Sequence, residues 1–121
     1  MDKISDFTDL IVWKKGHQLV LDIYKTTELF SSKERFGLVS QMQRAAVSIT
    51  SNIAEGFARR SKKEKVQFYF TSLASLAELR SQLIICKDIK YINEKSFNIF
   101  EEQAVEIRKL LNGLIKSSNN Y

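Results

Sequence analysis

The sequence contains no proline and only four glycines among its 121 residues, and this shortage limits the possible folds more than any other feature. Tight turns and the ends of sheets depend on these two residues, so a β-sandwich or a loop-rich enzyme fits poorly. Hydrophobic residues make up 44% of the chain, which is enough to form a core. We therefore expect an all-α protein of long helices, with residues 1–121 forming one domain.

Hydrophobic spacing and capping signals divide the chain into four predicted helices, which cover about residues 9–30, 33–59, 62–90 and 94–116. Ser31 and Ser61 each stand three positions before a glutamate, a capping-box pattern that starts a helix, and Asn93 can cap the last helix. Short connections favour neighbours that run in opposite directions. The sequence thus predicts an antiparallel up-down-up-down four-helix bundle, with a frayed segment from residue 116 onward.

Two of these helices carry informative apolar patterns. In the first, the predicted core face follows Leu10, Trp13, His17, Val20, Tyr24 and Thr27, with Val12, Leu19, Ile23 and Phe30 broadening the same face. The helix predicted at 62–90 is apolar on several sides, with Phe68, Tyr69, Phe70, Leu73, Leu76, Leu79, Leu83, Ile84, Ile85 and Ile89. Such a helix is buried, either at the centre of its own bundle or against another subunit.

The chain offers little material for catalysis. Di-iron bundle enzymes need Glu-x-x-His pairs, but His17 is the only histidine and position 14 is a lysine. We expect His17 to be hydrogen-bonded at the edge of the core, and Cys86 to be a small buried hydrophobe, since no second histidine can activate it. We predict a protein that is not an enzyme, with no catalytic residue, no metal and no cofactor.

Simple sequence patterns predict the cellular compartment and whether the protein associates with a membrane. A single cysteine cannot form an intrachain disulfide. The segment MDKISDFTDL has no apolar run of signal-peptide length, and no stretch of the chain approaches eighteen apolar residues. We expect a cytoplasmic protein with no membrane partner.

A polar stripe marks the helix predicted at 33–59. At 100° per residue, Arg44, Ser48, Asn52 and Glu55 fall within about 80° of one another, and Glu78 of the next helix is a possible partner. The stripe is either an ordinary solvated face or a buried or interfacial network, and its short side chains permit close approach of another helix. Gly56 is costly inside a helix, so either the backbone is closely approached there or the helix ends nearby.

The densest charge cluster follows directly. Five cations occur in seven residues beside a single acid, Glu64: Arg59, Arg60, Lys62, Lys63 and Lys65. Residues 1–65 carry twelve basic and eight acidic groups, whereas 66–121 carry seven and six, so most of the formal charge of +5 lies in the first half. The cluster is either a solvated turn or a surface that contacts phosphates without reading bases. Lys14 and Lys15 are secondary candidates.

Residues 7–92 resemble a known family. The blocks DLIVWKKGHQLVLDIYKTTELF, ERFGLVSQMQRAAVSITSNIAEGFARRSKKE and FYFTSLASLAELRSQL resemble the four-helix-bundle family of 23S rRNA intervening-sequence proteins, also called S23 ribosomal proteins. A related branch is the accessory variability proteins of diversity-generating retroelements. The chain departs from the usual pattern by lacking a proline in its first connection, and by having Leu73 and Ala74 where many members have an Arg-Gly pair.

The resemblance implies a homopentamer without established enzymatic activity, and the related branch implies binding of nucleic acid. Together with the residues, it predicts a homo-oligomer, a pentamer, that binds RNA or DNA non-specifically through the cluster at 59–65. The alternative is a protein-interaction scaffold or accessory subunit with no physiological nucleic-acid ligand. In both cases Arg44, Ser48, Asn52, Glu55 and Glu78 are assigned to structure or interface.

Overall fold

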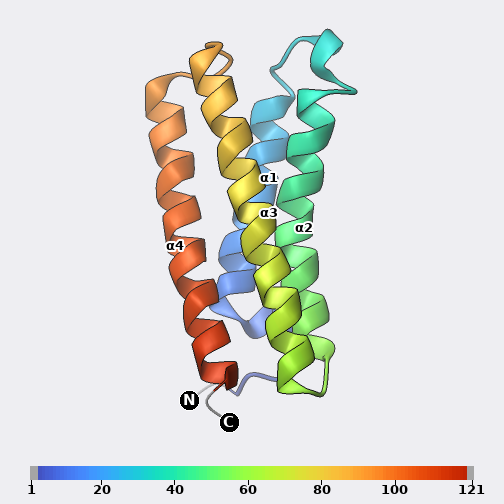
Figure 1. The fold of residues 1–121 in the computed structure, drawn as a ribbon. Coiled ribbons are helices and arrows are strands. Elements are labelled where there is room, and N and C mark those ends of the chain that lie inside the picture. The colour runs from blue at the N-terminus through green and yellow to red at the C-terminus, as the bar shows by residue number, and fades with distance from the viewer. Residues whose placement is uncertain (1–2, 120–121) are drawn as a thin grey trace.

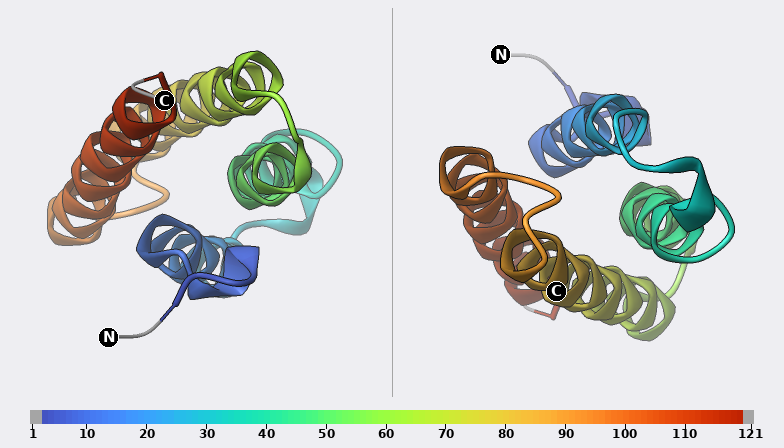
Figure 2. Two further views of the ribbon diagram at one scale, coloured as in Figure 1. Left: turned by 90° about the horizontal axis from the view of Figure 1, so that it is seen from below. Right: turned by 90° about the horizontal axis from the view of Figure 1, so that it is seen from above.

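The computed structural model describes residues 3–119 and contains four long α-helices. They are α1 (Ile11–Thr27), α2 (Leu38–Ala58), α3 (Lys62–Asp88) and α4 (Glu94–Asn119), with two short 3-10 helices, η1 (Phe7–Asp9) and η2 (Ser32–Glu34). Figure 1 shows the helices running alternately up and down, so that the start of α1, the α2–α3 connection and the end of α4 share one end of the bundle. Viewed end-on, the helices follow one another around the bundle in chain order (Figure 2). The predicted antiparallel four-helix bundle is confirmed.

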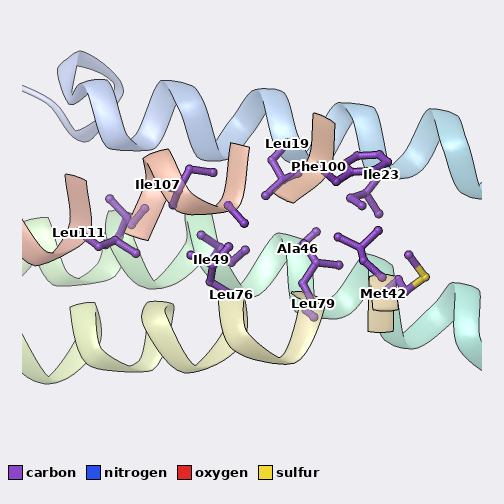
Figure 3. Close-up of a cluster of buried hydrophobic side chains, with 14 of the residues drawn as sticks. Leu19, Ile23, Met42, Ala46, Ile49, Leu76, Leu79, Phe100, Ile107 and Leu111 are labelled. Carbon is purple, nitrogen blue, oxygen red and sulfur yellow. The ribbon is translucent and has the colours of Figure 1, made fainter. Parts of the chain in front are cut away.

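The core runs along the centre of the bundle and draws on all four helices. Figure 3 shows Leu19 and Ile23 of α1 beside side chains of the other three helices; the fully buried set includes Leu19, Ile23, Met42, Ile49, Ile53, Tyr69, Leu76, Leu79, Ile107 and Leu111. Full burial of one such aliphatic side chain contributes roughly 1.5–3 kcal/mol relative to exposure. The buried residues of α4 recur at spacings of three and four: Phe100, Ala104, Ile107, Leu111 and Ile115.

The core face of α1 agrees with the prediction at Val12, Leu19, Ile23 and Thr27 and differs from it at His17 and Tyr24. The buried residues are Val12, Gly16, Leu19, Ile23 and Thr27, whereas Tyr24 is 40% exposed and His17 is exposed. A Cβ atom on Gly16 would lie 3.0 Å from the Thr50 side chain, so the line of closest approach between α1 and α2 passes through this glycine. A count of large apolar residues ignores glycine, and it therefore placed the face too far toward His17.

The two later capping predictions are confirmed. The Ser61 hydroxyl accepts a hydrogen bond from the backbone N–H of Glu64 at 3.1 Å, and α3 begins at Lys62. The Asn93 side chain accepts one from the backbone N–H of Ser96 at 2.8 Å, at the start of α4.

The predicted helix start at Ser31 is wrong. Ser31 makes no side-chain capping bond, only the short η2 follows, and α2 begins at Leu38 instead of near residue 33. The Glu34 carboxylate, which a capping box would direct back to Ser31, instead accepts a hydrogen bond from the Tyr91 hydroxyl at 2.9 Å. Gly37 then leaves the helical region of backbone space, at φ −112° and ψ −107°.

The remaining helix ends differ from prediction by a few residues. α1 covers Ile11–Thr27 instead of 9–30. α3 stops at Asp88 because Lys90 adopts a left-handed backbone (φ 66°), which lets the N–H groups of Lys90 and Tyr91 bond back to the carbonyls of Lys87 and Cys86. α4 extends to Asn119 through the segment predicted to fray, and residues 120–121 lie outside the described part of the chain.

Candidate nucleic-acid interface

The α2–α3 connection is a tight, three-residue junction. Arg59 leaves the helical region (ψ 152°), and Ser61 caps the start of α3. A Cβ atom on Gly56 would lie 2.6 Å from Cε1 of Tyr69, whose side chain is only 1% exposed. Both alternatives for Gly56 therefore hold, because the backbone is closely approached and α2 ends two residues later, at Ala58.

Two of the five predicted cations contact their own junction. The Lys65 ammonium donates to the carbonyl of Phe57 at 2.7 Å and to that of Gly56 at 3.4 Å. These carbonyls belong to the last turn of α2, where the Gly56 carbonyl also accepts the Arg59 N–H at 3.2 Å, so Lys65 helps to cap that helix. The Arg59 guanidinium lies 4.6 Å from the centre of the Phe68 ring. Their charges are thereby held in fixed positions at the end of the bundle.

The other three cations of the cluster, Arg60, Lys62 and Lys63, are exposed. They stand on a connection of three residues and on the first turn of α3, so the backbone beneath them has little freedom. The structure thus presents the cluster as a blunt, cationic end surface, with Lys65 and Arg59 held in place by the junction and Arg60 and Lys63 exposed.

The antiparallel topology adds further cations to this end. Lys14 and Lys15 lie near the start of α1, and Arg108, Lys109 and Lys116 lie in the second half of α4 (Figure 1). Lys15 Nζ lies 3.6 Å from Oε1 of Glu106 in a half-exposed ion pair, which contributes little to stability. The three α4 residues were not predicted as site residues; the up-down order of the helices was the signal that could have placed them here.

Charge counts confirm that this half of the bundle is basic. Residues 3–15, 55–66 and 106–118 together carry eleven Lys or Arg and five Asp or Glu. This surplus of six exceeds the formal charge of +5 of the whole chain. The basic end of the bundle, as we call the surface formed by these three segments, therefore accounts for the net charge of the protein.

The polar stripe of α2 divides into two parts. Its inner part joins α2 to α3: the Ser48 and Ser75 hydroxyls are 2.7 Å apart, and the Asn52 amide donates to the Ser48 carbonyl at 2.8 Å. Its outer part is exposed and charged, with Arg44 and Glu55 on α2 and Glu78 on α3. The predicted residues are brought together along one surface, but only the inner ones are hydrogen-bonded to one another.

The outer part lines a groove of about 720 Å³ along the exposed face of α2. Its lining is Tyr24, Ser40, Gln41, Gln43, Arg44, Ala45, Val47, Ser48, Ser51, Asn52, Glu55, Ser75 and Glu78. Most of the α2 residues in this set have short or medium side chains, so the surface is recessed between α1 and α3. We call this the α2 groove.

Comparison with known proteins identifies the family. The sequence model of the family described as 23S rRNA-intervening sequence protein matches residues 8–113. The chain belongs to this family. A crystal structure from Bacteroides thetaiotaomicron VPI-5482, a protein with unknown function from the S23 ribosomal protein family, is similar with a TM-score of 0.81 and 22% sequence identity. The match covers 88% of this chain and 99% of that one, and it shows the shared fold. No curated protein sequence matches the chain.

This member of the 23S rRNA-intervening sequence protein family leaves a large apolar surface uncovered. On the outer side of α3, Phe70, Ile84, Ile85 and Ile89 are 41–55% exposed. The sequence left open whether the chain's own bundle or another subunit buries this face. Within residues 3–119, the helices of the same chain do not cover it.

Cys86 and His17, for which no catalytic role was predicted, occupy contrasting positions in this family member. Cys86 is fully buried, with its sulfur 3.5 Å from that of Met42, and burial raises the pKa of its thiol to about 11. Its prediction as a small buried hydrophobe is confirmed. His17 is exposed and stacks on Trp13, and the structure gives it no hydrogen bond within residues 3–119. The predicted hydrogen-bonded position at the core edge is wrong, because the core face of α1 is centred near Gly16.

The described part of the chain holds neither a metal-binding cluster nor a membrane-spanning helix. Across residues 3–119, no three His, Cys, Asp or Glu side chains are grouped so as to bind a metal ion. Among the helices of the same segment, none combines the length and the apolar character needed to cross a bilayer.

Proposed function

We propose that the protein is a non-enzymatic homo-oligomer, a pentamer, that binds RNA or DNA non-specifically through the basic end of the bundle. The contacts are made by Arg59, Arg60, Lys62, Lys63 and Lys65, with Lys14 and Lys15 as additional members. The observation that carries the proposal is the concentration of the whole net charge at this one end.

The shape of the basic end favours phosphates over bases. The α2–α3 connection is too short to project from the bundle, so it has no helix or ribbon to insert into a groove of a duplex. Lysine and arginine side chains on such a surface contact the backbone phosphates, which carry no sequence information. Five neutralised phosphates on a duplex correspond to a log-log salt slope of about −4.5.

Two unpartnered surfaces support self-association. One is the recessed α2 groove, and the other is the apolar face of α3 around Phe70, Ile84 and Ile85. They are different surfaces of the bundle, so a contact between the groove of one copy and the α3 face of the next would be head-to-tail. Contacts of this type generate closed rings when the rotation between copies closes. A ring repeats the basic end in every subunit, and avidity then multiplies a weak contact.

Light scattering with and without a structured RNA, in one buffer at about 50 mM salt, tests both parts of the proposal. We expect a mass of five subunits that rises when RNA is added. Arg60→Glu combined with Lys63→Glu should keep the mass and lose the RNA. The matched control is Lys33→Glu with Arg35→Glu on the α1–α2 connection, which should bind normally. Absence of binding, or undiminished binding by the first double variant, would overturn the nucleic-acid proposal.

A protein-interaction scaffold is the second candidate, and the α2 groove favours it. The groove contains both signs of charge, from Arg44, Glu55 and Glu78, together with short hydroxyl side chains. This mixture suits a polar polypeptide surface better than a polyanion. A partner polypeptide that stays bound after nuclease treatment, and is released by Arg44→Glu, would establish this function in place of nucleic-acid binding.

A further inference from the structure

The first two turns of α1 carry an aromatic stack at the basic end. The His17 imidazole lies nearly parallel to the Trp13 ring, at an interplanar angle of 10° and a centroid distance of 4.8 Å. Phe7 contacts the other part of the Trp13 ring edge-on, at 5.3 Å and 69°. Trp13 packs against the core, whereas His17 is exposed. The stack therefore presents the imidazole as its outer layer.

The stack is fixed by the segment that precedes it. The Asp9 carboxylate accepts backbone N–H bonds from Ser5 and Asp6, both at 3.0 Å, and these bonds close a capping box around η1. These backbone hydrogen bonds also lower the pKa of Asp9, because they stabilise the charged carboxylate within the turn. η1 thereby holds Phe7 against Trp13, and a supported ring is a better stacking platform than a mobile one.

The His17 side chain takes no part in the hydrogen bonding of the described residues, and its ring contact there is with Trp13. Lys14, three residues before it, is exposed and lies on a neighbouring part of the helix surface, whereas Lys15 lies on the other side of α1 and pairs with Glu106. An aromatic ring face beside exposed cations is the arrangement by which proteins bind unpaired nucleotides: the cations contact phosphates and the ring stacks on a base.

We propose that His17, supported by Trp13, stacks on an unpaired base, so that the preferred ligand is single-stranded nucleic acid. This inference rests on the proposed function and specifies its ligand class. A duplex offers base faces only at its ends, and it can therefore use the cations but not the ring. Stacking is tolerant of sequence because every base has a π-face, so the binding stays non-specific.

Because His17 is the only histidine, its ring-proton resonances report on the site directly. The full chain is titrated at constant pH and about 50 mM salt with a short unstructured oligonucleotide, as RNA and as DNA, and with a fully paired, blunt-ended duplex. Stacking of a base shifts these resonances upfield with the unpaired strand and leaves them unchanged with the duplex. Comparison of the RNA and DNA titrations shows whether the sugar affects binding.

A matched pair of variants provides the second readout. His17→Phe keeps an aromatic face, whereas His17→Leu keeps an apolar cover over Trp13 without one, and the exposed position makes both compatible with the fold. We expect His17→Leu to bind the unpaired strand at least about fivefold more weakly than His17→Phe, with equal binding to the duplex.

The outcomes separate the inference from the proposed function. Binding of the unpaired strand with unshifted His17 resonances, or with equal affinity of the two variants, overturns base stacking and leaves the cationic contact intact. Failure of both ligands to bind at this salt concentration overturns both.

Discussion

The two connections that flank α2 both reverse the direction of the chain, but they differ in length and in the side chains that they expose. The chain leaves α2 through Arg59–Ser61, a junction in which Ser61 caps α3, Lys65 caps α2 and Gly56 lets Tyr69 close over the turn. It enters α2 through residues 28–37, where Leu29 and Phe36 are 86% and 91% exposed. The short junction places charges at fixed positions, and the long connection displays apolar side chains. The difference suggests that one end of the bundle binds an anion and the other contacts protein.

The largest effect is expected at the short junction. Gly56→Ala places a methyl group 2.6 Å from Tyr69 Cε1 and 3.0 Å from Phe68 Cβ, inside a closely packed turn. Overpacking of this kind costs about 1–3 kcal/mol, which outweighs the gain in helix propensity. Denaturant unfolding at fixed protein concentration measures the loss. Gly113→Ala on α4, where the added Cβ meets nothing within 4 Å, is the control and should be neutral or stabilising. Equal behaviour of the two variants would show that the junction is not tightly packed.

The two candidate caps give a smaller effect. Ser61→Ala removes a hydrogen bond to the N–H of Glu64 and should cost about 1 kcal/mol. Ser31→Ala removes no capping bond, because the Ser31 side chain makes none, and it should leave the unfolding midpoint unchanged. Both variants are compared in one set of chemical denaturation curves. A loss at Ser31 that matches the loss at Ser61 would mean that the Ser31 side chain also caps a helix.

The smallest effect on stability is expected from the long connection. Leu29→Ser with Phe36→Ser removes two side chains that are almost fully exposed, so the free energy of unfolding of the isolated bundle should change by less than about 0.5 kcal/mol. The mass measured by light scattering should fall, because exposed apolar residues of this size mark contacts with another chain. Ile11→Ser, at an exposed position near the start of α1, is the control. An unchanged mass would contradict a contact role for this connection.

Local signals explain why the fold was largely predictable from sequence. Ser61 and Asn93 cap helices through backbone N–H groups three residues away, and the seam of α4 follows a regular spacing. The start of α2 was not predictable, because the Glu34 carboxylate accepts a hydrogen bond from Tyr91, a residue fifty-seven positions later, and Ser31 makes no side-chain capping bond. The face of α1 was misplaced for a related reason: its centre is Gly16, which contributes no apolar side chain to a pattern.

The candidate site, like the fold, was predictable from the sequence only in part. The five cations at 59–65 were evident as a run of charge, but their division into anchored and exposed members depends on Phe57 and Phe68, whose contacts are set by the turn. Arg108, Lys109 and Lys116 joined the basic end only once the helices were placed side by side. The groove beside Arg44 and Glu55 required three helices to define it.

The salt dependence of RNA binding tests most directly the claim that the cations of the short junction form the interface. Affinities are measured between about 50 and 200 mM salt for the wild type, for Arg60→Ala with Lys63→Ala, and for Lys33→Ala with Arg35→Ala at the long connection. Loss of two phosphate contacts should reduce the log-log slope by about 1.8 for the first double variant on a duplex, with no change for the second. Equal slopes for all three proteins, or an equal reduction in both variants, would contradict the account.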